Sequence, residues 1–216
     1  MPDDALLAEQ LTYYRRRAAE YDRTAFGDVD AAGRRIADIL ADLRPAGDVL
    51  ELACGTGMWT RALVGWADRL TALDAAPEML AEARSRVPAR VVDYVLADVF
   101  GWRPPRRYDT VFFAFWLSHL PPDRFAEFWM LLRDWLAPGG RVLFVDEHPS
   151  EAGKEVYPDP DGYVVERRLA DGSAHRVVKV FAGPEEIRHR LADAGWRSAI
   201  RPNGSDWLVA EAWPLR

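Results

Sequence analysis

Cysteine and long apolar runs are scarce in this sequence of 216 residues. The single cysteine, Cys54, excludes an internal disulfide and a zinc site built from several thiolates, and it fits a reducing compartment. No stretch approaches the roughly 18 consecutive apolar residues that a membrane-spanning helix needs. The first residues also lack the basic start and apolar core of a signal peptide. We therefore expect a cytoplasmic protein without a membrane partner.

The chain has no excess of basic residues either. It carries 28 Lys and Arg against 34 Asp and Glu, a formal net charge of −6. Broad contact with a phosphate backbone draws its free energy from clustered Lys and Arg, so nucleic acid is not an expected partner. The sequence shows no metal-ligand spacing, so no metal site is predicted. A hydrophobic content of 49% excludes wholesale disorder, and the length favours one domain.

What is present is an alternation of helical patterns with apolar strand patterns. Helices are expected over 5–22 and 29–43. The strands that follow are expected at 48–52, 70–74, 91–97, 108–114 and 141–146. Strands that are apolar throughout and are joined by helices indicate a parallel sheet covered on both faces. The prediction is an α/β, doubly wound, Rossmann-like fold.

The pattern changes after Glu147. Residues 149–162 are expected to be a loop, and residues 170–173 a hairpin turn. A helix from Pro184 to Ala194 precedes two last strands, which flank Asn203-Gly204. We therefore predict a seven-stranded, mostly parallel sheet that ends in an antiparallel hairpin. The single domain, 1–216, would include a helical N-terminal lid over 1–44 and a loop and hairpin insertion over 149–182.

The most informative segment is the turn after the first strand, where Glu51 is followed by Leu-Ala-Cys-Gly-Thr-Gly. Gly55 and Gly57 allow the backbone to approach a ligand closely. In an open α/β sheet this turn lies where ligands bind, and Asp74, at the end of the next strand, can accept both hydroxyls of a ribose. The dinucleotide fingerprint needs a glycine where Thr60 stands, which disfavours a nicotinamide oxidoreductase. A nucleoside ligand without phosphate is favoured instead.

These residues resemble the class I S-adenosylmethionine-dependent methyltransferases, of the type that acts on small molecules. The family's first motif is an acid followed by x-G-x-G-x-G, and Glu51–Gly57 matches it with Ala53 at the first glycine. Asp74 matches the ribose-binding acid, and Asp98 matches the acid near the adenine amino group. The segments Tyr108–Val111, Phe115–Leu120 and Leu136–Gly140 match later family motifs. The resemblance covers residues 13–146 continuously.

The resemblance implies an enzyme whose cofactor is S-adenosyl-L-methionine and whose product is S-adenosyl-L-homocysteine. Glu51 is expected near the ammonium of the methyl donor, and the amides of the turn near its carboxylate. Tyr14 and Arg17 are placed to close over the amino acid tail, and Tyr21 to lie against the sulfonium. The full set of expected cofactor-binding residues is Tyr14, Arg17, Tyr21, Glu51, Ala53, Cys54, Gly55, Gly57, Trp59, Asp74, Ala75, Met79, Asp98, Val99, Phe100, Ala114 and Phe115.

Two histidines are the candidate catalytic residues. His119 follows the fourth strand, and its ordinary pKa of about 6.5 suits proton removal near neutrality. His148, after the fifth strand, belongs to a polar cluster on the same side. The expected reaction moves a methyl group to an O or N atom of a small, partly apolar molecule, in a monomer or homodimer. The alternatives are a protein or tRNA methyltransferase and a donor-binding protein without catalysis.

Overall fold

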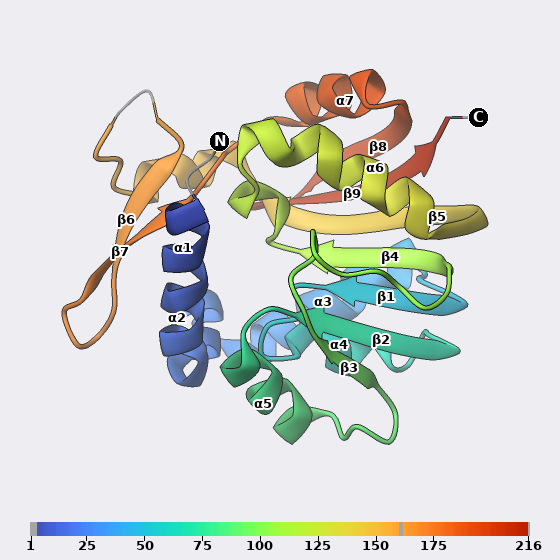
Figure 1. The fold of residues 1–216 in the computed structure, drawn as a ribbon, viewed down its shortest axis with the longest axis horizontal. Coiled ribbons are helices and arrows are strands. Elements are labelled where there is room, and N and C mark those ends of the chain that lie inside the picture. The colour runs from blue at the N-terminus through green and yellow to red at the C-terminus, as the bar shows by residue number, and fades with distance from the viewer. Residues whose placement is uncertain (1–3, 160–161, 216) are drawn as a thin grey trace.

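A computed structural model describes residues 4–159 and 162–215 of the protein (Figure 1). Its main sheet has seven strands in the order β3-β2-β1-β4-β5-β9-β8. β1 to β5 run parallel, whereas β9 runs antiparallel to both β5 and β8. This confirms the predicted fold class. The strands are β1 (Asp48–Leu52), β2 (Arg69–Asp74), β3 (Asp93–Leu96), β4 (Tyr108–Ala114), β5 (Leu136–Glu147), β8 (Trp196–Asn203) and β9 (Trp207–Pro214).

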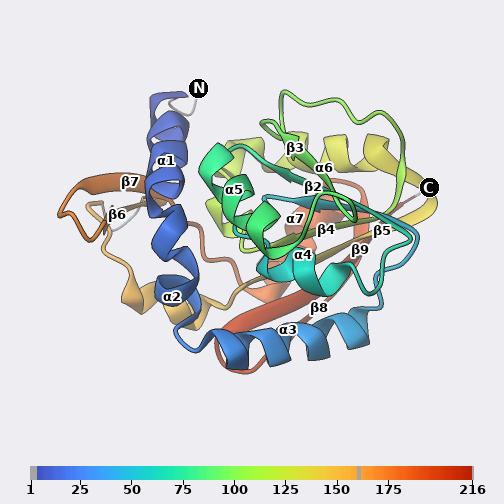
Figure 2. The same cartoon turned by 90° about the horizontal axis from the view of Figure 1, so that it is seen from below.

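Helices cover both faces of this sheet (Figure 2). One face carries α3 (Val29–Leu43), α4 (Met58–Leu63) and α5 (Pro77–Arg86), and the other carries α6 (Phe125–Trp135) and α7 (Pro184–Asp193). Neighbouring residues of β4 point to opposite faces, so Phe112 joins the core under α3 while Phe113 joins the core under α6. Both residues are fully buried, and the carboxyl half of this strand, Val111–Ala114, is apolar without a break.

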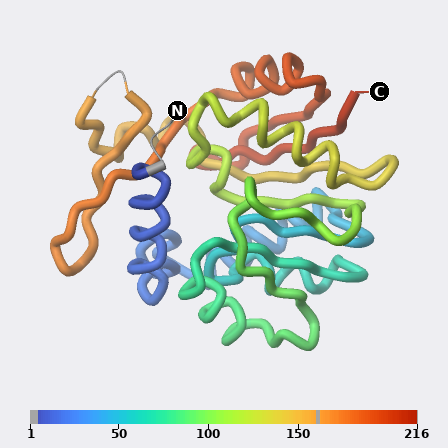
Figure 3. The backbone as a smooth tube through the Cα atoms, viewed as in Figure 1, coloured from blue at the N-terminus to red at the C-terminus, as the bar shows by residue number. Residues whose placement is uncertain are grey.

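The N-terminal helices and a small hairpin stand beside the main sheet (Figures 1 and 3). The N-terminal helices are α1 (Asp4–Arg17), the 3-10 turn η1 (Ala18–Glu20) and α2 (Tyr21–Phe26), in place of the single helix expected over 5–22. The hairpin consists of β6 (Val164–Arg168) and β7 (Ala174–Val178). It packs on α1 through a core of its own that contains Tyr13, Val165 and Val177.

The structure moves several predicted boundaries. β3 is shorter than expected, and β5 begins at Leu136 because a register shift between Tyr108 and Thr110 carries the pairing through the Pro-Gly-Gly turn. Residues Pro149–Lys154, expected to be part of a loop, form the 3-10 helix η4. After β7, the amide of Val180 donates a hydrogen bond to the Ser118 carbonyl oxygen, which joins the hairpin to the loop after β4. No helix within the described ranges, 4–159 and 162–215, is long and apolar enough to cross a membrane.

Candidate functional site

The turn after β1 contains left-handed backbone conformations, which residues with a side chain rarely adopt. Ala53 and Gly55 lie in the left-handed region, with φ of 49° and 55°. Gly57 also has a positive φ, and a Cβ there would lie 3.0 Å from Cα of Ala83 on α5. Glycine at 57 is therefore needed both for its backbone conformation and for the close approach of α5. The turn ends at Gly57, where α4 begins.

Asp74, at the end of β2, stabilises this turn through hydrogen bonds to backbone amides. Its Oδ2 accepts a hydrogen bond from the Gly55 amide at 2.8 Å, and its Oδ1 accepts one from the Ala76 amide at 2.8 Å. Burial raises the pKa of this carboxyl group, although the amide hydrogen bonds oppose the shift. Each carboxylate oxygen can accept more than one hydrogen bond, so acceptor capacity remains for two hydroxyls of a ligand.

A cavity of about 270 Å³, the inner cavity, opens beside Asp74 and the turn. Apolar residues of α1 close it on one side, and Met79, Val99 and Phe100 form an apolar end suited to a flat aromatic base. The predicted cofactor-binding residues that line it are Tyr14, Tyr21, Ala53, Gly55, Asp74, Ala75, Met79, Asp98, Val99, Phe100, Ala114 and Phe115. These residues fit a nucleoside: a carboxylate for the ribose, an apolar slot for the base and amides for an anionic tail.

The other predicted cofactor-binding residues lie elsewhere. Arg17 lines a second cavity, whereas Glu51, Cys54, Gly57 and Trp59 line neither cavity. Glu51 is buried beneath the turn, and its Oε2 accepts a hydrogen bond from the Thr60 hydroxyl at 2.6 Å. Burial raises the pKa of Glu51 to about 8, with a smaller contribution from the charge of Asp74. Burial also raises the pKa of the Cys54 thiol, which argues against a nucleophilic role.

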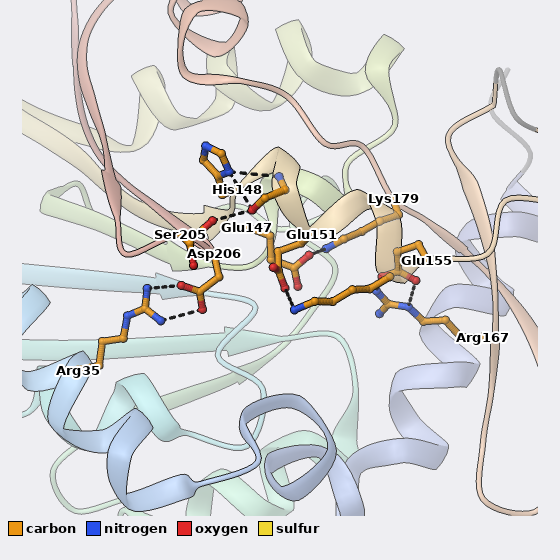
Figure 4. Close-up of polar contacts among 11 residues, drawn as sticks. Arg35, Glu147, His148, Glu151, Glu155, Arg167, Lys179, Ser205 and Asp206 are labelled. Atoms are coloured by element: carbon orange, nitrogen blue, oxygen red, sulfur yellow. Dashed lines mark hydrogen bonds and ion pairs between the residues drawn. The ribbon is translucent and has the colours of Figure 1, made fainter.

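The second cavity, the outer cavity, has a volume of about 660 Å³. Side chains of α1, α2, η4 and the hairpin line it, and many of them are charged. Most of its charged groups are paired: Figure 4 shows the carboxylates of Glu147 and Glu155 directed at Lys179 and Arg167. At the far end, Asp206 forms an ion pair with Arg35 at 2.9 Å. The cavity is therefore a polar chamber.

Four residues line both cavities and define the junction between them: Tyr14, Tyr21, Phe115 and His119. Tyr14 and Tyr21 come from the N-terminal helices, while Phe115 and His119 follow β4. The rings of Tyr14 and His119 meet edge to face, with centroids 5.5 Å apart. A group bound in the inner cavity therefore meets a group bound in the outer cavity between these four side chains.

His119 is held in one neutral form at the junction. Its Nδ1 lies 2.7 Å from the carbonyl oxygen of Val178, which can only accept, so Nδ1 carries the proton. Burial lowers the pKa of His119 well below its ordinary value, and the charges of Lys179, Arg167 and Arg17 lower it further. Nε2 is then unprotonated and accepts the hydrogen bond of the Tyr14 hydroxyl at 2.9 Å. Burial raises the pKa of Tyr14, so its hydroxyl keeps its proton.

The three cations that act on His119 come from different elements. The ammonium of Lys179 is buried, 2.5 Å from Glu147 and 3.0 Å from the Ser118 hydroxyl. Arg167 of β6 is mostly buried and pairs with Glu155. Arg17 lies over the Tyr21 ring at 4.9 Å and has no carboxylate partner within the described ranges. Lys179 and Arg167 are each paired with a carboxylate, so Arg17 is the one of these three cations whose charge is not offset by an acid within the described ranges.

His148 lies away from the junction and lines neither cavity. Its Nδ1 accepts the Ser150 amide at 3.1 Å and thereby caps η4. Conversely, Arg167, Lys179 and Glu155 were not predicted as site residues. They belong to a loop and hairpin without a recognisable motif, and the one available signal was a dense run of charge after β5. Within the described part of the chain, no group of acids, histidines or cysteine is arranged to hold a metal ion.

Comparison with known proteins identifies the family. Residues 49–140 match a family described as "Methyltransferase domain". The trans-aconitate 2-methyltransferase of Streptomyces avermitilis is 30% identical over 176 residues, 76% of this chain and 56% of the relative. The malonyl-[acyl-carrier protein] O-methyltransferase of Serratia marcescens is 33% identical over 135 residues, 61% of this chain and 49% of the relative. The chain thus spans about half the length of these curated relatives.

Two solved structures cover nearly the whole chain. A DhpI–SAH complex is 43% identical, with a TM-score of 0.87, over 99% of this chain and 98% of that chain. A DhpI–SAM–HEP complex is 42% identical, with a TM-score of 0.87, over 99% of this chain and 100% of that one. This chain belongs to the class I S-adenosylmethionine-dependent methyltransferase family.

Proposed function

We propose that this protein transfers the methyl group of S-adenosyl-L-methionine to an oxygen atom of a small acid. The observation that carries the proposal is the cluster of Lys179, Arg167 and Arg17 around a neutral His119, at the junction of the two cavities. From the sequence we expect the methyl group to be accepted by an O or N atom of the substrate. The cluster of cations favours a negatively charged oxygen atom as that acceptor. Cations in a partly buried site favour an anionic ligand much more than they would in water.

The inner cavity supplies the residues for the donor. Asp74 is suited to accept the ribose hydroxyls, and Met79, Val99 and Phe100 to enclose the adenine. The left-handed turn at 53–55 brings the backbone close enough for its amides to receive the donor carboxylate. When bound, S-adenosyl-L-methionine supplies an electrophilic methyl group on a sulfonium. Tyr21 and Phe115 present aromatic rings where the two cavities meet, which suits that cation.

The outer cavity supplies the residues for the acceptor. The guanidinium of Arg167 is the donor best suited to a carboxylate or a similar oxyanion, and Arg17 adds an uncompensated positive charge. Lys179 lines neither cavity, so its charge acts only from behind the outer cavity. The names of two curated relatives support this class, because trans-aconitate and the malonyl group are both carboxylic acids. In this chain the acid would exchange with, or join, the carboxylates that now pair with these cations.

An acid acceptor removes the need for a general base. A carboxylic acid has a pKa of about 4, so its oxygen is already ionised and nucleophilic near neutrality. His119 matches this chemistry, because its Nε2 already accepts the Tyr14 hydroxyl and is not free to take another proton. We therefore assign His119 the role of positioning Tyr14. Rate acceleration would come mainly from alignment of the two reactants, which can supply roughly 7–11 kcal/mol in favourable cases.

The test is a measurement of S-adenosyl-L-homocysteine formation with a panel of acceptors. The panel contains mono-, di- and tricarboxylic acids and phosphate monoesters, each with its amide, alcohol or amine analogue. Turnover with acids, and none with the matched neutral or cationic analogues, is the expected result. Turnover confined to amines or neutral hydroxyls would overturn the acid assignment. Tight binding of the cofactor without turnover on any acceptor would favour a non-catalytic binding protein.

A further inference from the structure

Asp22 and Arg86 line neither cavity, yet both bind the turn at which the donor is expected. We propose that they are positioning residues, which clamp the N-terminal helices onto that turn and so hold the donor site in its binding conformation. We refer to Asp22, Thr56 and Arg86 together as the clasp. The proposal rests on the proposed function, because it concerns the affinity of this site for S-adenosyl-L-methionine and its product.

The clasp is a closed ring of hydrogen bonds across three elements. Oδ1 of Asp22, on α2, accepts the Thr56 hydroxyl at 2.5 Å, while Oδ2 forms an ion pair with Arg86, on α5. Arg86 completes the ring by donating Nη1 to the Thr56 carbonyl at 2.7 Å. The side chains of Arg86 and Asp22 are only 22% and 19% exposed, so water screens this pair less than it screens a surface pair.

The position of Thr56 connects the clasp to the ligand site. It stands between Gly55, which lines the inner cavity, and Gly57, which packs against Ala83. Asp74 holds the turn from the inner side through the Gly55 amide, and the clasp holds it from the outer side. A turn with left-handed residues has other conformations available once released, and a site that must first select the right one binds its ligand less tightly.

A second ion pair between the N-terminal helices and α5 provides a matched control. Arg15 of α1 pairs with Glu78 at 2.9 Å, but both side chains are about half exposed, at 47% and 43%. Among the residues that the structure describes, the hydrogen bonds of the Arg15 guanidinium all run to Glu78 and none runs to the turn. An exposed pair of this kind contributes little. If the clasp only attached the N-terminal helices to α5, loss of either ion pair would change the affinity for S-adenosyl-L-homocysteine by the same amount.

The experiment compares Asp22→Asn, Arg86→Gln and their double variant with wild type and with Arg15→Gln and Glu78→Gln. S-adenosyl-L-homocysteine is the probe, with its affinity and dissociation rate measured by calorimetry and stopped flow. We expect each clasp variant to bind it about tenfold more weakly, mainly through faster dissociation, and the double variant no more weakly than the singles. Both control variants should stay within about twofold of wild type.

Hydrogen exchange of the amides at 54–57 separates positioning from general destabilisation. These amides should exchange faster in the unliganded clasp variants, while the melting temperature stays close to that of wild type. Unchanged affinity in folded Asp22→Asn and Arg86→Gln, or an equal loss in the Arg15 and Glu78 variants, would overturn the proposal. A wild-type protein that fails to bind S-adenosyl-L-homocysteine would instead overturn the proposed function, and the clasp proposal with it.

Discussion

Tyr14 and His119 are 105 positions apart in the chain, yet the Tyr14 hydroxyl donates to Nε2 of His119 at 2.9 Å. The Val178 carbonyl fixes the proton on the opposite nitrogen, so the histidine has one tautomer and one orientation. The bond joins the N-terminal helices to the loop after β4 at the point where the two cavities meet. In this arrangement Nε2 of His119 is the hydrogen-bond acceptor for the Tyr14 hydroxyl.

The first prediction concerns the pH profile of the reaction. A general base with an ordinary histidine pKa would make kcat fall as the pH drops through about 6.5. The pKa of His119 is lowered, so the residue is neutral both above and below that value. We expect kcat with an acid acceptor to show no histidine ionisation between about pH 6 and 8. An inflection near 6.5 that disappears in His119→Asn, which can still donate to Val178, would restore the base role.

The second prediction concerns the hydroxyl of Tyr14. In Tyr14→Phe the ring remains but the buried Nε2 of His119 loses its hydrogen-bond donor. Because the hydroxyl stands at the junction, we expect kcat to fall by about tenfold, with the affinity for S-adenosyl-L-homocysteine changed by less than about twofold. Steady-state kinetics and calorimetry on the same preparation measure both. Equal losses in kcat and in affinity would indicate a structural role in the inner cavity.

The third prediction concerns recognition of the acceptor. Arg167→Gln should raise KM for an acid acceptor by at least about tenfold and leave cofactor affinity unchanged, because Arg167 faces only the outer cavity. Arg176→Gln is the matched control, because Arg176 belongs to the same hairpin and lines neither cavity. Its side chain is 53% exposed and pairs with Glu9, so water screens its charge and we expect little change in KM. A similar effect of both substitutions would indicate general electrostatics.

The fourth prediction concerns the ribose site. Asp74→Ala should weaken binding of S-adenosyl-L-homocysteine by at least about tenfold, or about 1.4 kcal/mol, because it removes acceptors for the ligand and frees the Gly55 amide. Asp93→Asn, on the adjacent strand β3, is the control, since its side chain is 71% exposed at the opposite end of the strand. Calorimetry on the folded variants measures their affinity for S-adenosyl-L-homocysteine. Unchanged affinity in Asp74→Ala would place the ribose elsewhere.

The fold and the inner cavity could be predicted because they follow from local signals. Phe112 and Phe113 are both buried, on opposite faces of the sheet, so the second half of β4 is a continuous apolar run, which is typical of a parallel sheet. Parallel strands also bring their carboxyl ends to one edge, which places Gly55, Asp74 and Asp98 together although they are distant in the chain.

The outer cavity could not be predicted in the same way. It forms only when the hairpin folds back onto α1, and no local periodicity encodes this contact. Arg167 was therefore missed, and His148 was expected in the site although it caps η4. Glu51 shows a different limit. Its place at the end of β1 was clear, but only the packing of α4 shows that its carboxyl group turns to Thr60.

The last prediction follows from this buried carboxyl group. The pKa of Glu51 is raised to about 8 in the folded protein, whereas an unfolded glutamate titrates near 4.5. Between these values the folded state holds one proton more than the unfolded state, so this group makes stability fall by about 1.4 kcal/mol per pH unit as the pH rises. The contribution is fully present below about pH 4.5 and is lost as the pH approaches 8.

The variant Glu51→Gln tests this, because it keeps an acceptor for the Thr60 hydroxyl and removes the titrating carboxyl group. Denaturant unfolding of the unliganded proteins should therefore show the advantage of wild type over Glu51→Gln shrinking, or reversing, from pH 5 to 8. A difference between the two that is constant with pH would mean that Glu51 is ionised in the folded protein.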